Sequence, residues 1–228
     1  MSEAAGEVFG LPRGTLEVTS TSFDVNLTMM LGVDASRFRP GIRVLDLGAG
    51  ASNMTQVLND EYGVHCIAID PAYNDKAAFR VENDRYLVKA TTDYAGTELY
   101  ETSVVGRLGF ENDLTNNPGR YVAADARQLP FADGSIDLIL SSVFLSSKAG
   151  EYQQFVNDVM CEAMRVLRKG GSFHIGPIIT ETGYNGRVVE ANIIRGVDAA
   201  VKAFPRSRIK AARRIISQHG KAIEVSKR

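Results

Sequence analysis

Residues 42–53 restrict the possible folds more than any other stretch of the chain. A mainly apolar strand over 44–47 is followed directly by a turn that contains Gly48 and Gly50. Beyond the turn, apolar side chains recur with helical spacing over 54–62. A strand, a glycine turn and a helix N-terminus together let backbone N–H groups approach a ligand closely. Such a unit is typical of nucleotide-binding α/β folds, and the segments that follow must indicate which ligand it holds.

Short apolar segments that alternate with amphipathic helices predict a parallel sheet. After the first strand, we expect strands at 64–69, 121–124, 136–141 and 172–178 and a helix at 152–167. A helix between consecutive strands is the usual connection in a parallel sheet. The pattern therefore predicts an α/β fold with a mostly parallel central sheet.

The other segments suggest one main domain with additions. We expect residues 1–39 to form an N-terminal tail and cap helix, with the helix at 15–38, and residues 40–228 to form the domain. A crossover helix at 74–90 would leave residues 91–118 as an insertion. This insertion contains three aromatic residues. It either covers the ligand site as a lid or is a surface excursion with no role in the chemistry.

The C-terminal region is predicted to be helical and basic. We expect helices at 187–203 and 206–219 and a last strand at 222–225. Residues 195–228 hold ten basic and two acidic side chains, a net charge of +8, so the first 194 residues carry −9 of the total of −1. A basic segment can meet nucleic acid or an acidic membrane surface. We favour the alternative that it is the solvated face of a helix on an acidic protein.

Composition excludes several classes of protein. A length of 228 residues suits one domain, and 44% apolar and 23% charged residues are ordinary for a globular chain. No apolar run is long enough to span a bilayer, and the first residues lack a secretory pattern. Cys66 and Cys161 have neither metal-ligand nor Cys-x-x-Cys spacing, so we interpret them as buried reduced thiols. These features predict a cytoplasmic protein without a metal site.

Asp70 is the first residue that limits which ligand the glycine turn could bind. It lies 20 residues beyond Gly50, at the carboxyl end of the second predicted strand. A carboxylate at this place can accept hydrogen bonds from both hydroxyls of a ribose that lies across the glycine turn. The alternative is a turn or helix-capping role. The spacing favours the ribose, but it does not separate a dinucleotide from another adenosine-containing cofactor.

Four segments, taken in order, resemble the motifs of class I S-adenosylmethionine-dependent methyltransferases over about residues 40–180. They are Val44–Gly50, Ile67–Asp70, Ala124–Asp137 and Glu162–Gly171. The last two are the most discriminating, and the set is similar to quinone-biosynthesis and other small-molecule methyltransferases. The resemblance implies a Rossmann-like three-layer αβα sandwich, with S-adenosylmethionine as cofactor and S-adenosylhomocysteine as product. The chain departs from the family at Ser52, where a third glycine is common, and in lacking an evident pair of strands after the fifth.

The resemblance also implies a set of cofactor-binding residues. They are Asp46, Gly48, Ala49, Gly50, Asp70, Pro71, Asp125, Ala126 and Ser141. Asp46 would orient the amino group of the cofactor, Asp70 would hold the ribose hydroxyls, and Asp125 would accept from the adenine amine. The Ala126 amide would lie near a ring nitrogen, and the Ser141 carbonyl would face the ammonium group.

The acceptor side has no comparable motif. We expect it to include Phe23, Asn26, Ser142 and Phe144, and no catalytic residue can be named. Methyl transfer from a sulfonium is a direct in-line displacement that depends mainly on alignment, with a general base only where the acceptor must lose a proton. We interpret His174, inside the fifth predicted strand, as a sheet histidine rather than such a base.

Three other functions share part of this pattern. An RNA methyltransferase would use the basic C-terminal region for phosphate contacts, although the stretch from 141 to 144 lacks the Asn/Asp-Pro-Pro-aromatic segment that suits a base amine. A cofactor-binding protein without turnover would keep the same cofactor residues. A nicotinamide dehydrogenase would share the glycine turn and Asp70 but leaves the 125–131 segment unexplained. The prediction is therefore a methyltransferase acting on a small molecule, with nucleic acid as the less favoured partner.

Overall fold

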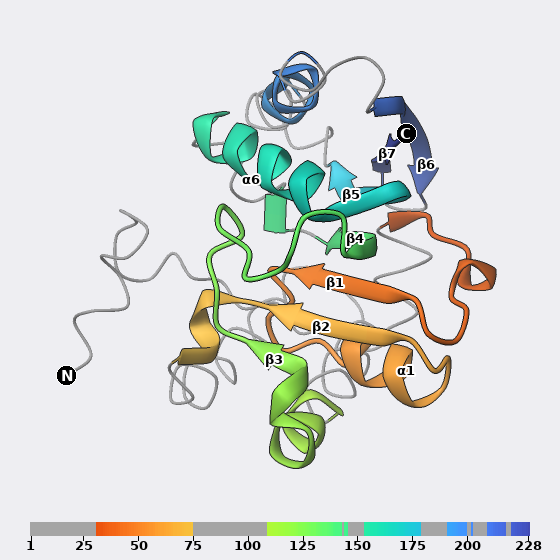
Figure 1. Ribbon diagram of the computed structural model, residues 1–228, viewed down its shortest axis with the longest axis vertical. Helices are drawn as coiled ribbons and strands as arrows, with labels where there is room; N and C mark the ends of the chain where they lie inside the picture. The colour runs from red at the N-terminus through yellow and green to blue at the C-terminus, as the bar shows by residue number, and fades with distance from the viewer. Residues whose placement is uncertain are drawn as a thin grey trace, which may run out of the picture.

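A seven-stranded sheet in the order β3-β2-β1-β4-β5-β7-β6 forms the centre of the computed structural model (Figure 1). The structure describes residues 31–74, 109–142, 144–145, 153–178, 191–199, 202, 209–217 and 220–228. The strands are β1 (Arg43–Leu47), β2 (His65–Ile69), β3 (Tyr121–Val122), β4 (Ile136–Ser142), β5 (Leu167–Ile178), β6 (Ile209–Ser217) and β7 (Gly220–Lys227). Strands β1 to β5 pair in parallel, whereas β7 is antiparallel to both β5 and β6.

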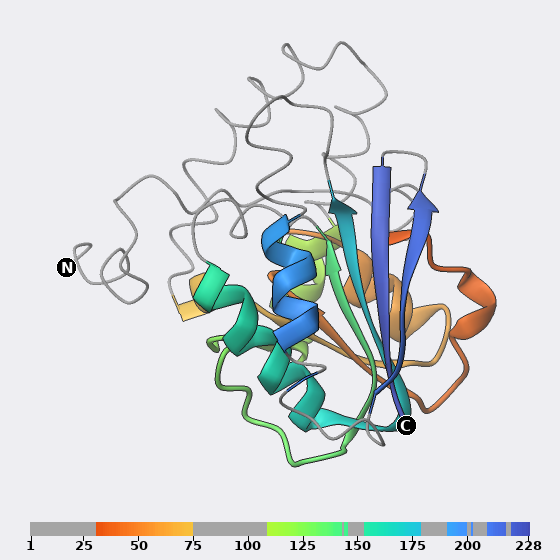
Figure 2. The ribbon, with the colours of Figure 1, turned by 90° about the horizontal axis from the view of Figure 1, so that it is seen from above.

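Helices lie against both faces of the sheet (Figure 2). The labelled α-helices are α1 (Met54–Asp60) and α6 (Gln153–Val166), and residues 109–116 and 191–199 are also helical. The short 3-10 helices are η2 (Ala35–Arg37), η3 (Pro71–Asn74) and η4 (Pro118–Arg120). The apolar side of α6 and that of 191–199 share one core with the central strands, and α1 packs into a second core on the opposite face. This arrangement confirms the predicted three-layer αβα sandwich with a mostly parallel sheet.

The C-terminal region differs from its prediction. Residues 209–217 are the edge strand β6, not part of a basic helix at 206–219, and they form an antiparallel hairpin with β7. The prediction of a last strand at 222–225 is confirmed, because those residues lie inside β7. The segment at 191–199 is helical as expected. The chain therefore has the pair of strands after β5 that was not evident in the sequence, and Lys210, Arg213 and Arg214 lie in β6 and not in a basic helix.

The N-terminal helix is also shorter than predicted within the described residues. Residues 32–34 are not helical, and the next helical turn is only η2, which the Asp34 side chain caps by accepting from the Ser36 N–H at 2.8 Å. Leu31, Val33 and Phe38 are buried in the core on the α1 face. Residues 15–30 of the predicted helix lie outside the described part of the chain.

The insertion between β2 and β3 contributes its end to the core. Phe110 is 1% exposed and its ring centroid lies 6.0 Å from that of Tyr73 and 5.4 Å from that of Tyr121. Asp113 is buried beside them and accepts from the Tyr121 hydroxyl at 2.8 Å. Residues 109–118 therefore pack against the β3 edge. The predicted helix at 74–90 is described only at Asn74, and residues 91–108 of the predicted lid are not described.

The two cysteines have different surroundings. Cys66 is buried in β2, as predicted, and burial raises the pKa of its thiol well above the usual range. Cys161 lies on α6 and is only partly buried, so the prediction of a buried thiol is wrong for this residue. No helix in the described segments is long and apolar enough to cross a membrane.

Lys227 fixes the end of α6 from the last strand. Its ammonium donates to the carbonyl oxygens of Met164 at 2.7 Å and Leu167 at 2.6 Å, and more weakly to that of Arg165 at 3.4 Å. The carbonyls at the C-terminal end of a helix lack intrahelical partners and carry partial negative charge. This contact therefore ties β7 to the α6–β5 junction.

We expect Lys227→Met to lower the free energy of unfolding by about 1–2 kcal/mol, because the substitution keeps the side-chain stem and removes the donors. Urea denaturation of the full chain would measure the loss. Lys169→Met is the matched control, since Lys169 is exposed at the start of β5 and a surface change of this kind should stay within about 0.5 kcal/mol. Equal stability of the two variants would contradict a capping role.

Candidate cofactor site

The candidate site lies where the strand order of the sheet reverses. β2 and β3 lie on one side of β1, whereas β4 and the later strands lie on the other. In open α/β sheets, ligands bind beyond the carboxyl ends of the strands at this switch point. The β1 end leads into the predicted glycine turn, and the β4 end leads to Ser142 and Phe144. The topology thus brings two of the predicted segments together.

The glycine turn is held against β2 by its own backbone. Gly48 and Gly50 have φ of 66° and 55°, a conformation that disfavours residues with a side chain. The Gly48 N–H donates to the Ile69 carbonyl at 2.8 Å, and the Gly50 N–H donates to Asp70 Oδ2 at 3.1 Å. The Tyr73 hydroxyl donates to the Gly50 carbonyl at 2.8 Å. Both polar groups of Gly50 are therefore fixed from the segment after β2.

Asp70 has the turn role that was considered as the alternative to ribose binding. Its Oδ1 accepts from the Ala72 N–H at 2.9 Å at the start of η3, next to Pro71, so it does act in a turn. Its Oδ2 holds Gly50. Asp70 thus organises the glycine turn from the segment after β2, and its ribose role stays a prediction.

Asp46 is a buried acid beside the glycine turn. It is 2% exposed at the end of β1, and its Oδ2 has no hydrogen-bond partner among the described residues. Burial, with the nearby negative charge of Asp70 as a second cause, raises the pKa of Asp46 to about 8. A buried carboxylate with an unpartnered oxygen is costly unless a proton or a cation meets it. This environment fits a ligand that brings an ammonium group.

Ser52 and Asn53 begin α1 behind the turn. The Ser52 hydroxyl accepts from the Met54 N–H at 3.1 Å, whereas the side chain of the formal N-cap residue Asn53 makes no capping bond. Ser52 therefore satisfies one of the free N–H groups of the first helical turn. The serine at the position where a third glycine is common has a structural explanation.

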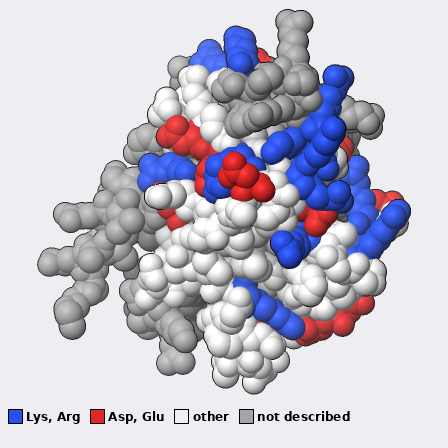
Figure 3. Space-filling model, in the orientation of Figure 1, with Lys and Arg blue, Asp and Glu red and all other residues white. Residues whose placement is uncertain are grey.

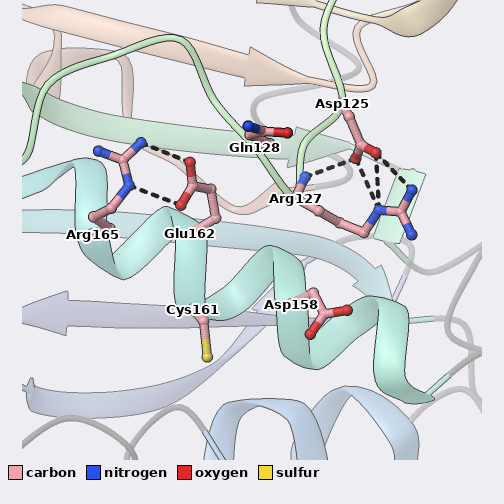
Figure 4. A pocket seen from close by; sticks show the side chains of 7 residues that line it. All are labelled: Asp125, Arg127, Gln128, Asp158, Cys161, Glu162 and Arg165. Atoms are coloured by element: carbon pink, nitrogen blue, oxygen red, sulfur yellow. Dashed lines mark hydrogen bonds and ion pairs between the residues drawn. The ribbon is translucent and has the colours of Figure 1, made fainter.

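Asp125 and Ala126 lie on the loop after β3. Ala126 is 5% exposed, whereas the Asp125 side chain is 28% exposed. Asp125 accepts from the backbone N–H of Arg127 at 2.8 Å and forms an ion pair with the Arg127 guanidinium, 2.6 Å from Nη2 to Oδ2. Asp125 and Arg127 border an open pocket of about 730 Å³ between this loop and α6 (Figure 4). The predicted adenine acceptor is therefore accessible but engaged by a neighbouring cation.

Glu162 and Arg165 of α6 hold the rest of this loop in place. Glu162 Oε1 accepts from the Leu129 N–H at 2.7 Å and from the Arg165 guanidinium at 2.7 Å. Arg165 also donates to the carbonyls of Leu129 at 3.0 Å and Phe131 at 2.9 Å. Two residues of the segment at 162–171, Glu162 and Arg165, therefore hold the loop that begins at Asp125. This contact links the third and fourth of the sequence segments that resemble the family.

We expect Arg165→Met to lower the free energy of unfolding by about 1–3 kcal/mol, because several donors to one loop are lost from a group that is about one-third exposed. The measurement is urea denaturation. Arg168→Met is the control: Arg168 is 54% exposed and pairs with Asp137 on the surface. A loss no greater than that of the control would mean that Arg165 does not organise the loop.

The β4 end contributes Ser141, Ser142 and Phe144. Ser141 is fully buried, and its hydroxyl accepts from the Leu145 N–H at 3.4 Å. The ring of Phe144 lies directly on Gly48: a methyl group added to Gly48 would lie 2.6 Å from Phe144 Cδ2 and closer still to Cγ. Close packing by an aromatic ring is thus a second reason for a glycine here. The acceptor-side candidates Phe23 and Asn26 lie outside the described residues.

His174 is a buried sheet residue, as predicted. It is 1% exposed, and its Nε2 lies 2.8 Å from the Arg37 guanidinium, which also donates to Glu224 at 2.9 Å. Burial lowers the pKa of His174 to about 4, so the ring is neutral near pH 7. The cluster joins β5, β7 and η2 and shows no feature of a general base.

Sequence reasoning missed three residues of the site. Tyr73 holds Gly50, Arg127 holds Asp125, and Phe155 of α6 lies between Arg127 and Phe144. Tyr73 stands three residues after Asp70, and Arg127 stands two residues after Asp125. This closeness in sequence to predicted site residues was the signal that could have identified them. Phe155 has no local signal, because its contacts depend on the packing of α6.

The sequence of this chain matches a known family of protein domains. The family of methyltransferase domains matches residues 45–175, more than half of the chain. A ubiquinone/menaquinone biosynthesis C-methyltransferase of Idiomarina loihiensis is 25% identical over 139 residues, which cover 61% of this chain and 43% of that protein. The chain thus spans less than half the length of this curated relative.

Solved structures share the fold at low sequence identity. The (4+2)-cyclase SpnF aligns with a TM-score of 0.51 and 14% identity over 84% of this chain and 76% of its own. A TehB-like S-adenosylmethionine-dependent methyltransferase of Corynebacterium glutamicum aligns with a TM-score of 0.49 and 14% identity over 86% and 89% of the two chains. Because the family match covers the motifs from β1 to β5, this chain belongs to the family of methyltransferase domains.

Proposed function

We propose that the protein transfers a methyl group from S-adenosylmethionine to a small-molecule acceptor by direct in-line displacement. The observation that carries this proposal is the buried, unpartnered oxygen of Asp46 beside the glycine turn and Asp70. A ligand with an ammonium group next to a ribose would give Asp46 a counter-charge and place the ribose hydroxyls near the carboxylate of Asp70. S-adenosylmethionine carries both groups.

Each described residue of the site then has a defined part. Asp46 and the carbonyl of Ser141 bind the ammonium group, and the turn from Gly48 through Ala49 to Gly50 supports the methionine part. Asp70, with Pro71 fixing the chain after it, accepts the ribose hydroxyls. On the separate loop after β3, Asp125 accepts from the adenine amine and the Ala126 N–H donates to the ring. The loop contacts of Glu162 and Arg165 support the position of this last pair.

The chain contributes alignment rather than covalent chemistry. The bound cofactor supplies a methyl group on a positively charged sulfur, an electrophile that needs no further activation. Holding it against the acceptor in a site screened from water can account for much of the rate through effective molarity. Phe144 and Ser142, both half-buried at the end of β4, would line the acceptor side. A base is needed only for an acceptor that loses a proton, and His174, neutral and buried, is not assigned that role.

A small molecule is the acceptor class that we favour. The relative from Idiomarina loihiensis is named for methylation in quinone biosynthesis, and its match covers 61% of this chain. The described part of the basic C-terminal region beyond residue 208 belongs to the sheet as β6 and β7. Figure 3 shows Lys and Arg side chains on that side of the molecule with acidic groups among them. A flat or apolar acceptor would suit the aromatic ring of Phe144.

A methyl-transfer assay tests this function. S-adenosylmethionine with a labelled methyl group would be incubated with the protein and with either a small-molecule metabolite extract or total RNA. We expect label to enter the small-molecule fraction and Asp70→Ala to abolish that incorporation. Label found only in RNA would show that the acceptor is RNA and not a small molecule. If the protein binds the cofactor but neither fraction gains label, the protein is a cofactor binder without turnover.

A further inference from the structure

Side chains of the protein occupy both ends of the proposed cofactor site. At the methionine end, the Phe144 ring covers Gly48 so closely that even a methyl group on Gly48 would collide with it. Gly48 lies in the turn proposed to support the methionine part of the cofactor. The same surface of the turn therefore has two competing occupants, the ring and the ligand.

At the adenine end, Arg127 engages Asp125. Arg127 Nε donates to Oδ1 at 3.1 Å and to Oδ2 at 3.0 Å, and Nη2 donates to Oδ2 at 2.6 Å (Figure 4). With the backbone bond from the Arg127 N–H, both carboxylate oxygens of Asp125 are already accepting. An adenine amine that binds Asp125 must share these oxygens with the guanidinium or displace it.

One aromatic residue connects the two ends. The ring of Phe155, near the start of α6, meets the Phe144 ring edge to face, with 5.8 Å between centroids and 79° between planes. The Arg127 guanidinium lies over the Phe155 ring, with Cζ 5.4 Å from the centroid. A continuous row of contacts therefore runs from Gly48 through Phe144, Phe155 and Arg127 to Asp125. Among the described residues of this row, Phe155 contacts both Phe144 and Arg127.

We propose that Phe144, Phe155 and Arg127 form a latch across the cofactor site. The latch holds Phe144 on the glycine turn and Arg127 on the adenine acceptor, and cofactor binding displaces both side chains. Because both pack against Phe155, release of one weakens the support of the other. This inference rests on the proposed function, since it takes the same residues as the cofactor site.

The latch lowers the apparent affinity for the cofactor. A ligand that binds only the open conformation has its affinity reduced by the fraction of molecules that are open. Arg127 and Asp125 are 35% and 28% exposed, so their ion pair alone is weak, and the cation–π and aromatic contacts add to it. Contacts of this strength correspond to an affinity penalty of about three- to tenfold.

The test is calorimetric titration of S-adenosylhomocysteine into the full chain. We compare the original protein with Arg127→Met, which keeps a stem over Phe155 and removes the ion pair, and with Phe155→Leu, which keeps apolar bulk and removes the shared ring. Both variants should bind the ligand about three- to tenfold more tightly. Arg168→Met removes an exposed ion pair on the surface and should leave the affinity unchanged. Thermal unfolding of each variant confirms that it is folded.

A double-mutant cycle tests the connection between the ends. Phe144→Leu and Arg127→Met should show a coupling in binding free energy that disappears when Phe155 is leucine in all four proteins. Unchanged or weaker binding by folded Arg127→Met and Phe155→Leu would overturn the latch, because those side chains would then support the ligand or have no effect. Failure of the original protein and of every variant to bind would overturn the cofactor assignment itself, and the latch with it.

Discussion

Replacing Asp70 by alanine is expected to weaken the binding of S-adenosylhomocysteine by at least about a hundredfold. Asp70 is proposed to accept two ribose hydroxyls, and hydrogen bonds to a charged group contribute about 1.5–3 kcal/mol each. The substitution also releases the Gly50 N–H, which Asp70 now holds at 3.1 Å. The ligand therefore loses direct contacts and the fixed geometry of the turn together.

Calorimetry with folded variants measures this effect. Asp60→Ala is a suitable control, because Asp60 ends α1 and pairs with Arg120 on the surface. We expect the control to bind like the original protein. Asp70→Asn should fall between the two, since an amide keeps one acceptor oxygen and loses the charge. Unaltered affinity in a folded Asp70→Ala protein would remove Asp70 from the site.

Asp46→Asn is expected to have opposite effects on stability and on binding. An aspartate in the unfolded chain titrates near 3.8, whereas burial and the Asp70 charge raise the pKa of Asp46 to about 8 in the folded protein. Between these values the folded protein holds a proton that the unfolded chain has released. By linkage, the contribution of Asp46 to stability falls as pH rises through this window, and the loss is complete above about pH 8.

Asparagine has the shape of a protonated aspartate and does not titrate, so the variant should avoid this loss. We expect Asp46→Asn to be more stable than the original protein by about 2–5 kcal/mol at about pH 9, with little difference near pH 4. Its affinity for S-adenosylhomocysteine should fall about tenfold or more, because the ammonium group loses its counter-charge. Urea denaturation across pH and calorimetry measure the two effects.

Asp113→Asn is expected to change the free energy of unfolding in the opposite direction to Asp46→Asn. Asp113 is equally buried, but its carboxylate accepts from Arg120, Tyr121 and Asn117 at 2.7–2.8 Å. Removing the charge of a paired buried acid is destabilising. The same chemical change should therefore stabilise the protein at position 46 and destabilise it at position 113. A loss of stability in both variants would mean that Asp46 is a satisfied structural residue.

Local patterns in the sequence were sufficient to predict the elements from β1 to β5. The apolar runs at β1, β2 and β4 and the periodicity of α6 report burial directly, and the structure has these elements within a few residues of their predicted bounds. The resemblance named Asp46, Gly48, Asp70 and Asp125, and the structure places them at or beyond the carboxyl ends of β1, β2 and β3, at the same edge of the sheet. Alternation of strands and helices determines that edge, so the sequence contains the information.

The hairpin of β6 and β7 could not be recognised in this way. Ile209, Ala212 and Ile216 repeat with helical spacing, and alanine, arginine and lysine are good helix formers. Pairing with β7 outweighs these weak preferences, because tertiary context overrides propensity. The pairing is specified by the partner strand, as in the register of Arg213 with Glu224, rather than by the segment itself. The contacts of Phe155 were invisible for the same reason.

The most direct test of the whole account is titration of S-adenosylmethionine into the folded full chain, with NAD as the competing adenosine-containing ligand. We expect saturable binding of S-adenosylmethionine to one site per chain and no binding of NAD. Because Asp46 gains a cation, its pKa should fall on binding, and protons should be released into the buffer near pH 7. The absence of any heat with S-adenosylmethionine, or saturable binding of NAD in its place, would contradict the account.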